Sequence, residues 1–79
     1  MEYQLLMRWE YVVSVDRYIT VEVYERQGTD HTGQFLKYYL KVLHDGIEVK
    51  RIGIEKFHTA MFTFHKTIDL EVRHHVQNS

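Results

Sequence analysis

The chain contains no cysteine and no proline, only four glycines, and no long apolar run. The lack of cysteine excludes a disulfide framework, a thiolate nucleophile and any cysteine-ligated zinc site. A membrane-spanning helix needs about 20 mostly apolar residues in succession, and the chain has no such run. The first residues also lack the basic-then-apolar pattern of a secretory signal. We therefore expect a cytoplasmic protein that neither enters a membrane nor forms disulfides.

Neither sign of charge is in clear excess. Ten Lys and Arg stand against eleven Asp and Glu, which gives a formal net charge of −1, and no segment forms a basic stripe. Strong non-specific binding to nucleic acid requires several basic side chains that neutralise phosphates together, so the charge pattern disfavours it.

What the sequence does contain is a globular composition in a short chain. Its 79 residues are 44% hydrophobic, 14% aromatic and 27% charged, and we expect them to form a single domain, residues 1–79. A chain of this length buries only about 60–65% of the surface that it exposes when unfolded. Its stability should therefore be modest, and a partner subunit would add to it.

Four segments are rich in β-forming residues and alternate between polar and apolar positions. We expect strands at about residues 4–13, 17–26, 35–44 and 47–54. The second segment alternates most cleanly, with Ile19, Val21 and Val23 on one face. In the first segment, alternation places Leu5 in the same row as Trp9.

The dipeptide Asp45-Gly46 predicts a hairpin turn between the third and fourth strands, because a type I′ turn needs positive φ at both positions. A simple two-residue turn pairs Val42 with Val49, but it also sets Lys41 opposite Lys50. Like charges opposite one another are unfavourable, and a bulge that removes one clash creates another. The sequence therefore leaves the register of this hairpin open.

Residues from about 55 to 75 are expected to form one helix, because apolar side chains recur there at spacings of three and four. The stripe consists of Phe57, Met61, Phe64, Ile68 and Val72, with Ala60 beside it. The predicted fold class is α+β: a four-stranded, mainly antiparallel meander with one C-terminal helix packed on one face (ββββα).

One helix covers only one face of the sheet, so the other face is open to water or to a partner. The sequence does not decide whether the first strand is central or at an edge. It also leaves open whether the row of Trp9 and Tyr11 or the row of Leu6 and Val12 points outward.

The histidines of the expected helix are candidate metal ligands. His58, His65 and Asp69 lie along one side of the expected helix, but His58 and His65 are two turns apart, about 10 Å, which is too far to ligate one ion. The adjacent His74 and His75 point about 100° apart on a helix. We interpret both groups as solvated side chains and assign no metal and no cofactor.

Catalytic patterns are equally weak. Ser14 and Ser79 are the only serines, and neither lies in a glycine-flanked elbow. Glu10 and Glu22 can approach one another across the first hairpin, but exposed acids on a flat sheet lack the burial that tunes a pKa. Gly28 and Gly33 are isolated and do not form a phosphate-binding loop. We predict that the chain is not an enzyme and has no catalytic residues.

The chain has more aromatic residues than one helix-on-sheet core can use. Tyrosine, tryptophan and basic residues anchor many protein interfaces. The predicted partner-binding residues are Trp9, Tyr18, Tyr24, Lys37, Tyr39 and Lys41. We therefore expect a small protein-binding module that forms a homodimer through its sheet. Its size and architecture resemble those of compact proteins encoded by phages and other mobile elements, which implies an inhibitor or regulator of a host enzyme or defence system.

Two alternatives stay open. The segment from Tyr38 to Glu71, a hairpin followed by a helix, resembles in outline the arm-binding domains of phage integrases. This resemblance implies DNA binding by the sheet, with Lys37, Tyr39, Lys41, Lys50 and Arg51 as the groove contacts. The other alternative is a histidine-based protein that responds to metal or to pH.

Overall fold

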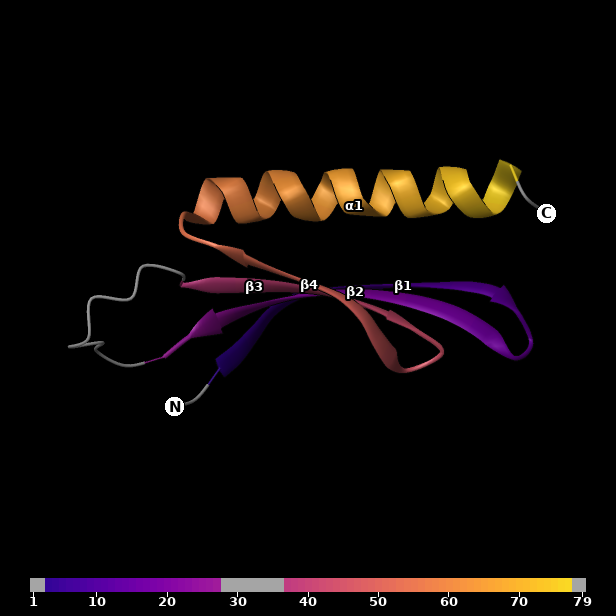
Figure 1. Ribbon diagram of the computed structural model, residues 1–79, viewed down its shortest axis with the longest axis horizontal. Helices are drawn as coiled ribbons and strands as arrows, with labels where there is room; N and C mark the ends of the chain where they lie inside the picture. The colour runs from indigo at the N-terminus through magenta and orange to yellow at the C-terminus, as the bar shows by residue number, and fades with distance from the viewer. Residues whose placement is uncertain (1–2, 28–36, 78–79) are drawn as a thin grey trace.

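The chain folds into two layers, in which one helix lies across a four-stranded sheet (Figure 1). The computed structural model describes residues 3–27 and 37–77. Its elements are β1 (Tyr3–Ser14), β2 (Arg17–Arg26), β3 (Tyr38–His44), β4 (Ile47–Ile54) and α1 (Phe57–Gln77). All neighbouring strands pair antiparallel, in the order β1-β2-β3-β4. The predicted ββββα meander is confirmed, and β1 is an edge strand.

The described strands and helix match the expected segments to within a few residues. The strand expected from residue 35 begins at Tyr38, and the two residues Phe35 and Leu36 lie outside the described part of the chain. The helix begins at Phe57 instead of residue 55. No helix in the described residues is apolar enough over a sufficient length to cross a membrane.

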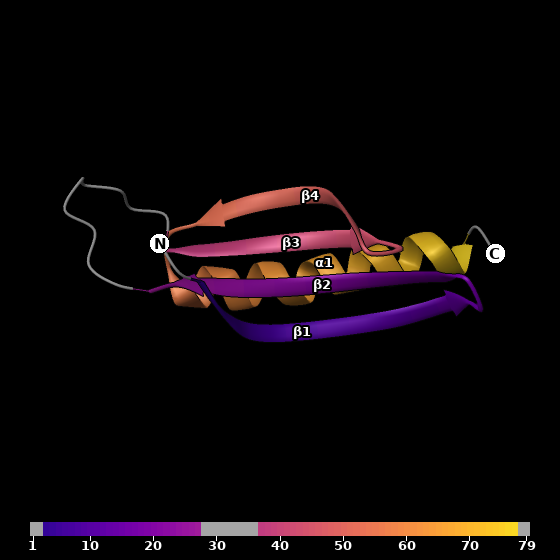
Figure 2. The same ribbon diagram turned by 90° about the horizontal axis from the view of Figure 1, so that it is seen from below.

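The core lies between α1 and the face of the sheet that it covers. Its buried members are Ile19, Val21, Val23, Tyr38, Leu40, Val42, Ile54, Ala60 and Phe64. They come from β2, β3, the end of β4 and the helix, while side chains of the edge strand β1 pack against this cluster and are only partly buried. Figure 2 shows why: α1 runs behind β2 and β3, so the outer strands are less covered. The two central strands therefore carry most of the burial.

The hairpin between β3 and β4 turns at Asp45-Gly46, where both residues have positive φ (55° and 82°), as a type I′ turn requires. A bulge follows the turn, so that Val42 lies opposite Lys50 and Lys41 lies opposite Arg51. The simple pairing of Val42 with Val49 is therefore not the one formed. The bulge sets Leu40 opposite Ile52, which places two apolar side chains together against the helix.

A second bulge, between Leu5 and Met7, changes the face of the start of β1. Met7 lies opposite Val23 on the face covered by the helix, whereas Leu5 lies opposite Tyr24 on the other face. The prediction that Leu5 shares a row with Trp9 is therefore wrong. The extra residue at the bulge reverses the alternation for everything before it.

The side of α1 that is most buried is rotated slightly from the predicted stripe. Ala60, Phe64 and Thr67 are buried, whereas Phe57 is 50% exposed and Ile68 is half-buried. Phe57 covers the edge of the core through a ring contact with Tyr38, with 5.9 Å between centroids. Glu71 lies four residues after Thr67, about one helical turn further along the same buried side of α1. Its carboxylate therefore faces the sheet.

Candidate functional site

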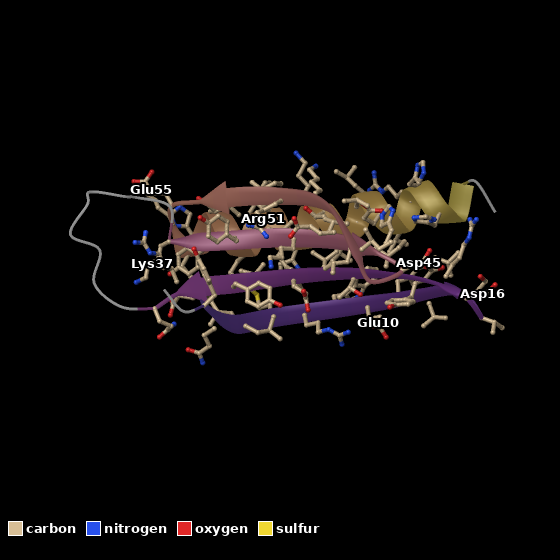
Figure 3. All side chains as sticks on the ribbon, turned by 60° about the horizontal axis from the view of Figure 1, so that its bottom comes forward. Glu10, Asp16, Lys37, Asp45, Arg51 and Glu55 are labelled. Carbon is tan, nitrogen blue, oxygen red and sulfur yellow. The ribbon has the colours of Figure 1, made fainter. Side chains whose placement is uncertain are left out.

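The side of the sheet that faces away from α1, here called the open face, carries most of the tyrosine and charge in the described sheet. Figure 3 views this side, with Arg51 over the β3–β4 half and Glu10 at the β1 edge. The strand register assigns its residues, because a side chain directly opposite Tyr24 or Glu22 shares their face. Those from the four strands are Tyr3, Leu5, Arg8, Glu10, Val12, Tyr18, Thr20, Glu22, Tyr24, Arg26, Tyr39, Lys41, Leu43, Glu48 and Arg51.

A small cavity lies within this face, and we call it the tyrosine pocket. Its lining consists of Tyr3, Tyr24, Tyr39, Lys41 and Arg51, and its volume is about 180 Å³. The rings of Tyr3 and Tyr39 meet edge to face with 5.2 Å between centroids. Tyr24 and Tyr39 lie directly opposite one another on β2 and β3. The pocket therefore has aromatic walls drawn from three strands.

Two cations stand over the rings of the tyrosine pocket. The Lys41 ammonium lies 4.9 Å from the ring centre of Tyr24, and the Arg51 guanidinium lies 5.8 Å from that of Tyr39. Contacts of this kind are worth about 0.5–1 kcal/mol at exposed sites. These cation–π contacts hold the two basic groups at the rim of the pocket. There they can donate hydrogen bonds to an incoming carboxylate or carbonyl oxygen.

Carboxylates lie next to the basic groups of this face. Glu48 accepts a hydrogen bond from Arg51 at 3.0 Å and lies 3.9 Å from Lys41. Lys41 and Arg51 lie opposite one another on β3 and β4, and the carboxylate of Glu48 offsets the repulsion between their charges. Arg8 pairs with Glu10 at 3.0 Å and with Glu22 at 3.4 Å. The two acids considered as a catalytic pair, Glu10 and Glu22, are therefore separated by a shared arginine and form a surface charge network.

Two of the pocket hydroxyls hold their protons more tightly than free tyrosine does. Burial, the hydrogen bond that its hydroxyl donates to Glu22 (3.1 Å) and the negative charge of Glu22 raise the pKa of Tyr24 above 10.0. A hydrogen bond with Tyr39 is the largest cause that raises the pKa of Tyr3. Both groups are neutral hydrogen-bonding tips at physiological pH.

Three of the six predicted partner-binding residues, Tyr24, Tyr39 and Lys41, come together in the tyrosine pocket. The other two lining residues, Tyr3 and Arg51, are not among the predicted partner-binding residues, although Arg51 appears with Tyr39 and Lys41 as a groove contact in the DNA-binding alternative. Arg51 could have been found by placing the bulge in the hairpin correctly, since it then stands opposite Lys41. Tyr3 could not, because its face depends on the bulge in β1.

The remaining three predicted contact residues lie elsewhere. Tyr18 is on the open face but at the opposite end, where its backbone N–H donates to Asp45. Lys37 is exposed just before β3, at the end of the sheet near Glu55 (Figure 3). Trp9 lies opposite Val21, stacks on Tyr11 and packs against the core. Of the two rows that the sequence left open, the row of Trp9 and Tyr11 therefore faces the helix, and Val12 lies on the open face.

Among the helix residues that the sequence offered as metal ligands, His58, His65 and Asp69 do not form a common group, whereas His75 is half-buried beside Glu71 instead of solvated as predicted. His58 and His65 are exposed, and Asp69 pairs with Arg73 at 3.0 Å instead of with His65. Nothing in these contacts favours a metal at this set.

Comparison with protein families, curated proteins and solved structures gave no match. The function is therefore inferred from the geometry of the chain itself.

The pKa of Tyr24 gives a direct test of the open-face geometry. Glu22→Gln removes the negative charge and the strongest acceptor, so the pKa of Tyr24 should fall towards 10 while burial keeps part of the shift. Because the folded state holds this proton to a higher pH than the unfolded chain does, Tyr24 weakens folding only above about pH 10. The phenolate absorbance, followed as the pH is raised, measures the shift. The part of this absorbance change that is missing in Tyr24→Phe belongs to Tyr24. Glu25→Gln is the matched control, and an equal shift in both variants would contradict the contact.

Proposed function

We propose that the chain is a non-enzymatic protein-binding module that acts through the open face of its sheet, with the tyrosine pocket as its anchor site. The tyrosine pocket is the observation that carries this proposal. Tyrosine and arginine are among the residues that dominate binding energy at protein interfaces. The volume of about 180 Å³ suits a single partner side chain, and it is smaller than the roughly 300–1,000 Å³ of small-molecule sites.

The partner that we propose first is a second copy of the chain, which gives a homodimer. The charges on the open face are mixed: Arg8, Lys41 and Arg51 alternate with Glu10, Glu22 and Glu48. A two-fold axis over such a face can set opposite charges against each other, and the net charge of −1 adds little repulsion. A domain of this size has a small core, so the apolar area that a partner buries adds a large share to its stability.

The biological role that we propose for this binding is inhibition or regulation of another protein, of the kind exerted by small mobile-element products. The support is a pocket built from aromatic rings and paired charges instead of a nucleophile and its base. This role is a second step, and it depends on the open face being a contact surface.

The charge pairs also weigh against the alternative of DNA binding. Phosphate contacts rely on basic side chains that are free to neutralise the backbone. On the open face, Arg8, Lys41 and Arg51 each have a carboxylate within 4.0 Å. Lys50, one of the proposed groove contacts, lies opposite Val42, on the other side of the sheet. A DNA mobility shift that weakens steeply with salt would reverse this preference.

The proposal is tested by the absolute mass of the protein in solution, measured by light scattering after gel filtration over a range of concentrations. We expect a dimer whose dissociation constant rises about thirtyfold or more in Tyr39→Ala, because truncating an interface tyrosine at a hot spot costs about 2 kcal/mol or more. Phe62→Ala is the matched control, since this ring is 67% exposed on the outer side of the helix. Circular dichroism checks that both variants keep their helix.

Two results would contradict the proposal in different ways. A monomer at every concentration would rule out the homodimer. A dimer that survives Tyr39→Ala but is dispersed by Phe62→Ala would place the contact on the helix and remove the open face from the argument.

A further inference from the structure

A second group of side chains meets on the opposite side of the sheet, where the C-terminal turns of α1 pass over the end of β3. His44 is the last residue of β3 and lies opposite Ile19, so it faces the helix. Glu71 and His75 are one turn apart on α1 and continue the buried line of Ala60, Phe64 and Thr67. The rotation of the helix thus brings a carboxylate and an imidazole onto a histidine of the sheet.

The three side chains point their ligand atoms at one another. Glu71 Oε2 lies 3.5 Å from His44 Nε2 and 3.6 Å from His75 Nε2. One oxygen or nitrogen from each residue lies within 4.8 Å of the other two. Although the His44 side chain is 41% exposed, both Nε2 atoms are buried, and neither makes a hydrogen bond. Buried polar atoms without partners are uncommon and call for an explanation.

The distances from Glu71 Oε2 to the two histidine nitrogens fit a shared metal ion better than they fit ion pairs. A charge-assisted hydrogen bond between nitrogen and oxygen has a length of about 2.7–2.9 Å, clearly shorter than either contact. In a tetrahedral zinc site with bonds of about 2.0–2.1 Å, the ligand atoms stand about 3.3–3.5 Å apart. An ion between the three residues would give both buried nitrogens a partner and would also be ligated by the Glu71 carboxylate.

We propose that His44, Glu71 and His75 form a binding site for a divalent transition-metal ion of the zinc class. Two imidazole nitrogens and one carboxylate oxygen suit such ions, whereas calcium and magnesium prefer ligand sets made wholly of oxygen. The C-terminal end of a helix also favours a cation, because its free carbonyl groups carry partial negative charge.

The surroundings leave room for a fourth ligand. A cavity of about 90 Å³ adjoins His44 and His75 and is also lined by Val13, Arg17 and Asp45. A water molecule occupies about 30 Å³ in the liquid, so one fits. Asp45 already accepts a hydrogen bond from the backbone N–H of Tyr18 at 3.0 Å, and Arg17 and Asp45 contribute one charge of each sign to the lining. The proposed site therefore has three protein ligands and an accessible fourth position.

An ion at this place would join two parts of the chain that are far apart in sequence. His44 adjoins the turn of the β3–β4 hairpin, and the two other ligands lie near the end of α1. Because a ligand that binds only the folded state stabilises it, the ion should raise the melting temperature. This inference does not depend on the protein-binding role of the open face.

The test uses the full chain, freed of metal with EDTA and titrated with zinc chloride in a calorimeter. We expect one zinc ion per chain and a dissociation constant that rises about tenfold or more in His44→Gln, Glu71→Gln and His75→Gln. His65→Gln and His58→Gln are matched controls, because they lie on the exposed side of the same helix and should bind zinc as the unmodified chain does. Cobalt(II) should give the intense visible absorption of a four-coordinate site in the unmodified chain, and Glu71→Gln should lose it.

Circular dichroism of each variant without metal separates lost binding from lost folding. Glu71→Gln is the decisive variant, since it keeps the shape of the side chain while removing its charge. The proposal is overturned if the unmodified chain shows no saturable zinc binding, if folded Glu71→Gln binds as tightly as the unmodified chain, or if His65→Gln weakens binding as much as His75→Gln does.

Discussion

Replacing Phe64 with alanine is expected to lower the free energy of unfolding by about 3–5 kcal/mol, the range found for buried phenylalanine. Phe64 is 7% exposed and belongs to the core cluster between the helix and the two central strands. Small domains of this length rarely gain more than about 3–5 kcal/mol from their core, so the variant should lie near the limit of folding. Urea unfolding followed by circular dichroism measures the effect.

Phe62→Ala is the control for this prediction, because it removes the same side chain from the same helix two residues earlier. Phe62 is 67% exposed, and a surface substitution of this kind changes stability by about 0.5 kcal/mol or less. Equal losses in the two variants would mean that the helix is rotated about its axis relative to the structure described. The Glu71–His44 contact would then be lost as well, so this pair of variants also tests the geometry of the proposed metal site.

The fold was predictable because two signals in the sequence are strong. In β2, Ile19, Val21 and Val23 alternate with other residues so regularly that only one face of the strand can be the buried one. In the structure these three side chains are buried. In α1, the recurrence of apolar residues without glycine or proline sets the length of the helix. Both signals are periodic over several residues, so a single unusual position does not change them.

The bulges were not predictable in the same way. Leu5 and Leu6 are both apolar, so the alternation of β1 looks unbroken whichever of them is the extra residue. One inserted residue nevertheless moves Leu5 to the open face and brings Tyr3 against Tyr39. The strand propensities of single residues do not indicate which residue of β1 is the extra one, because the position of the bulge is set by how the side chains of β1 pack against those of β2.

The two proposed sites differ in how many of their residues could be predicted from the sequence. Tyr24, Tyr39 and Lys41 share a face through strand alternation alone, which is why half of the predicted contact set comes together. The cluster of His44, Glu71 and His75 depends on a rotation of the helix by a fraction of a turn, and the apolar stripe does not resolve so small an angle. Glu71 and His75 are spaced like ligands on one helix face, but His44 is 27 residues from Glu71 and is placed only by the tertiary fold.

The second large effect is expected in Leu40→Ala, which should lower the free energy of unfolding by about 2–5 kcal/mol. Leu40 is fully buried on β3 and stands between Val23 and Ile52 on the face that the helix covers. The cavity left by its side chain lies under the helix, where two packed layers can relax only a little. Thermal and urea unfolding give the value, and it should not depend on protein concentration beyond the dependence of the unmodified chain.

Leu43→Ala on the same strand is the control that also reports on the open face. Leu43 is half-buried and lies opposite Thr20 and Glu48, away from the helix. In an isolated chain its truncation should cost less than half as much as that of Leu40, since part of its side chain is already in water. If a second copy covers the open face, the cost of Leu43→Ala should increase with protein concentration while the cost of Leu40→Ala stays constant. A concentration-independent cost for Leu43→Ala that equals that of Leu40→Ala would contradict the assignment of the two faces, because neither water nor a second copy would then be in contact with this side chain.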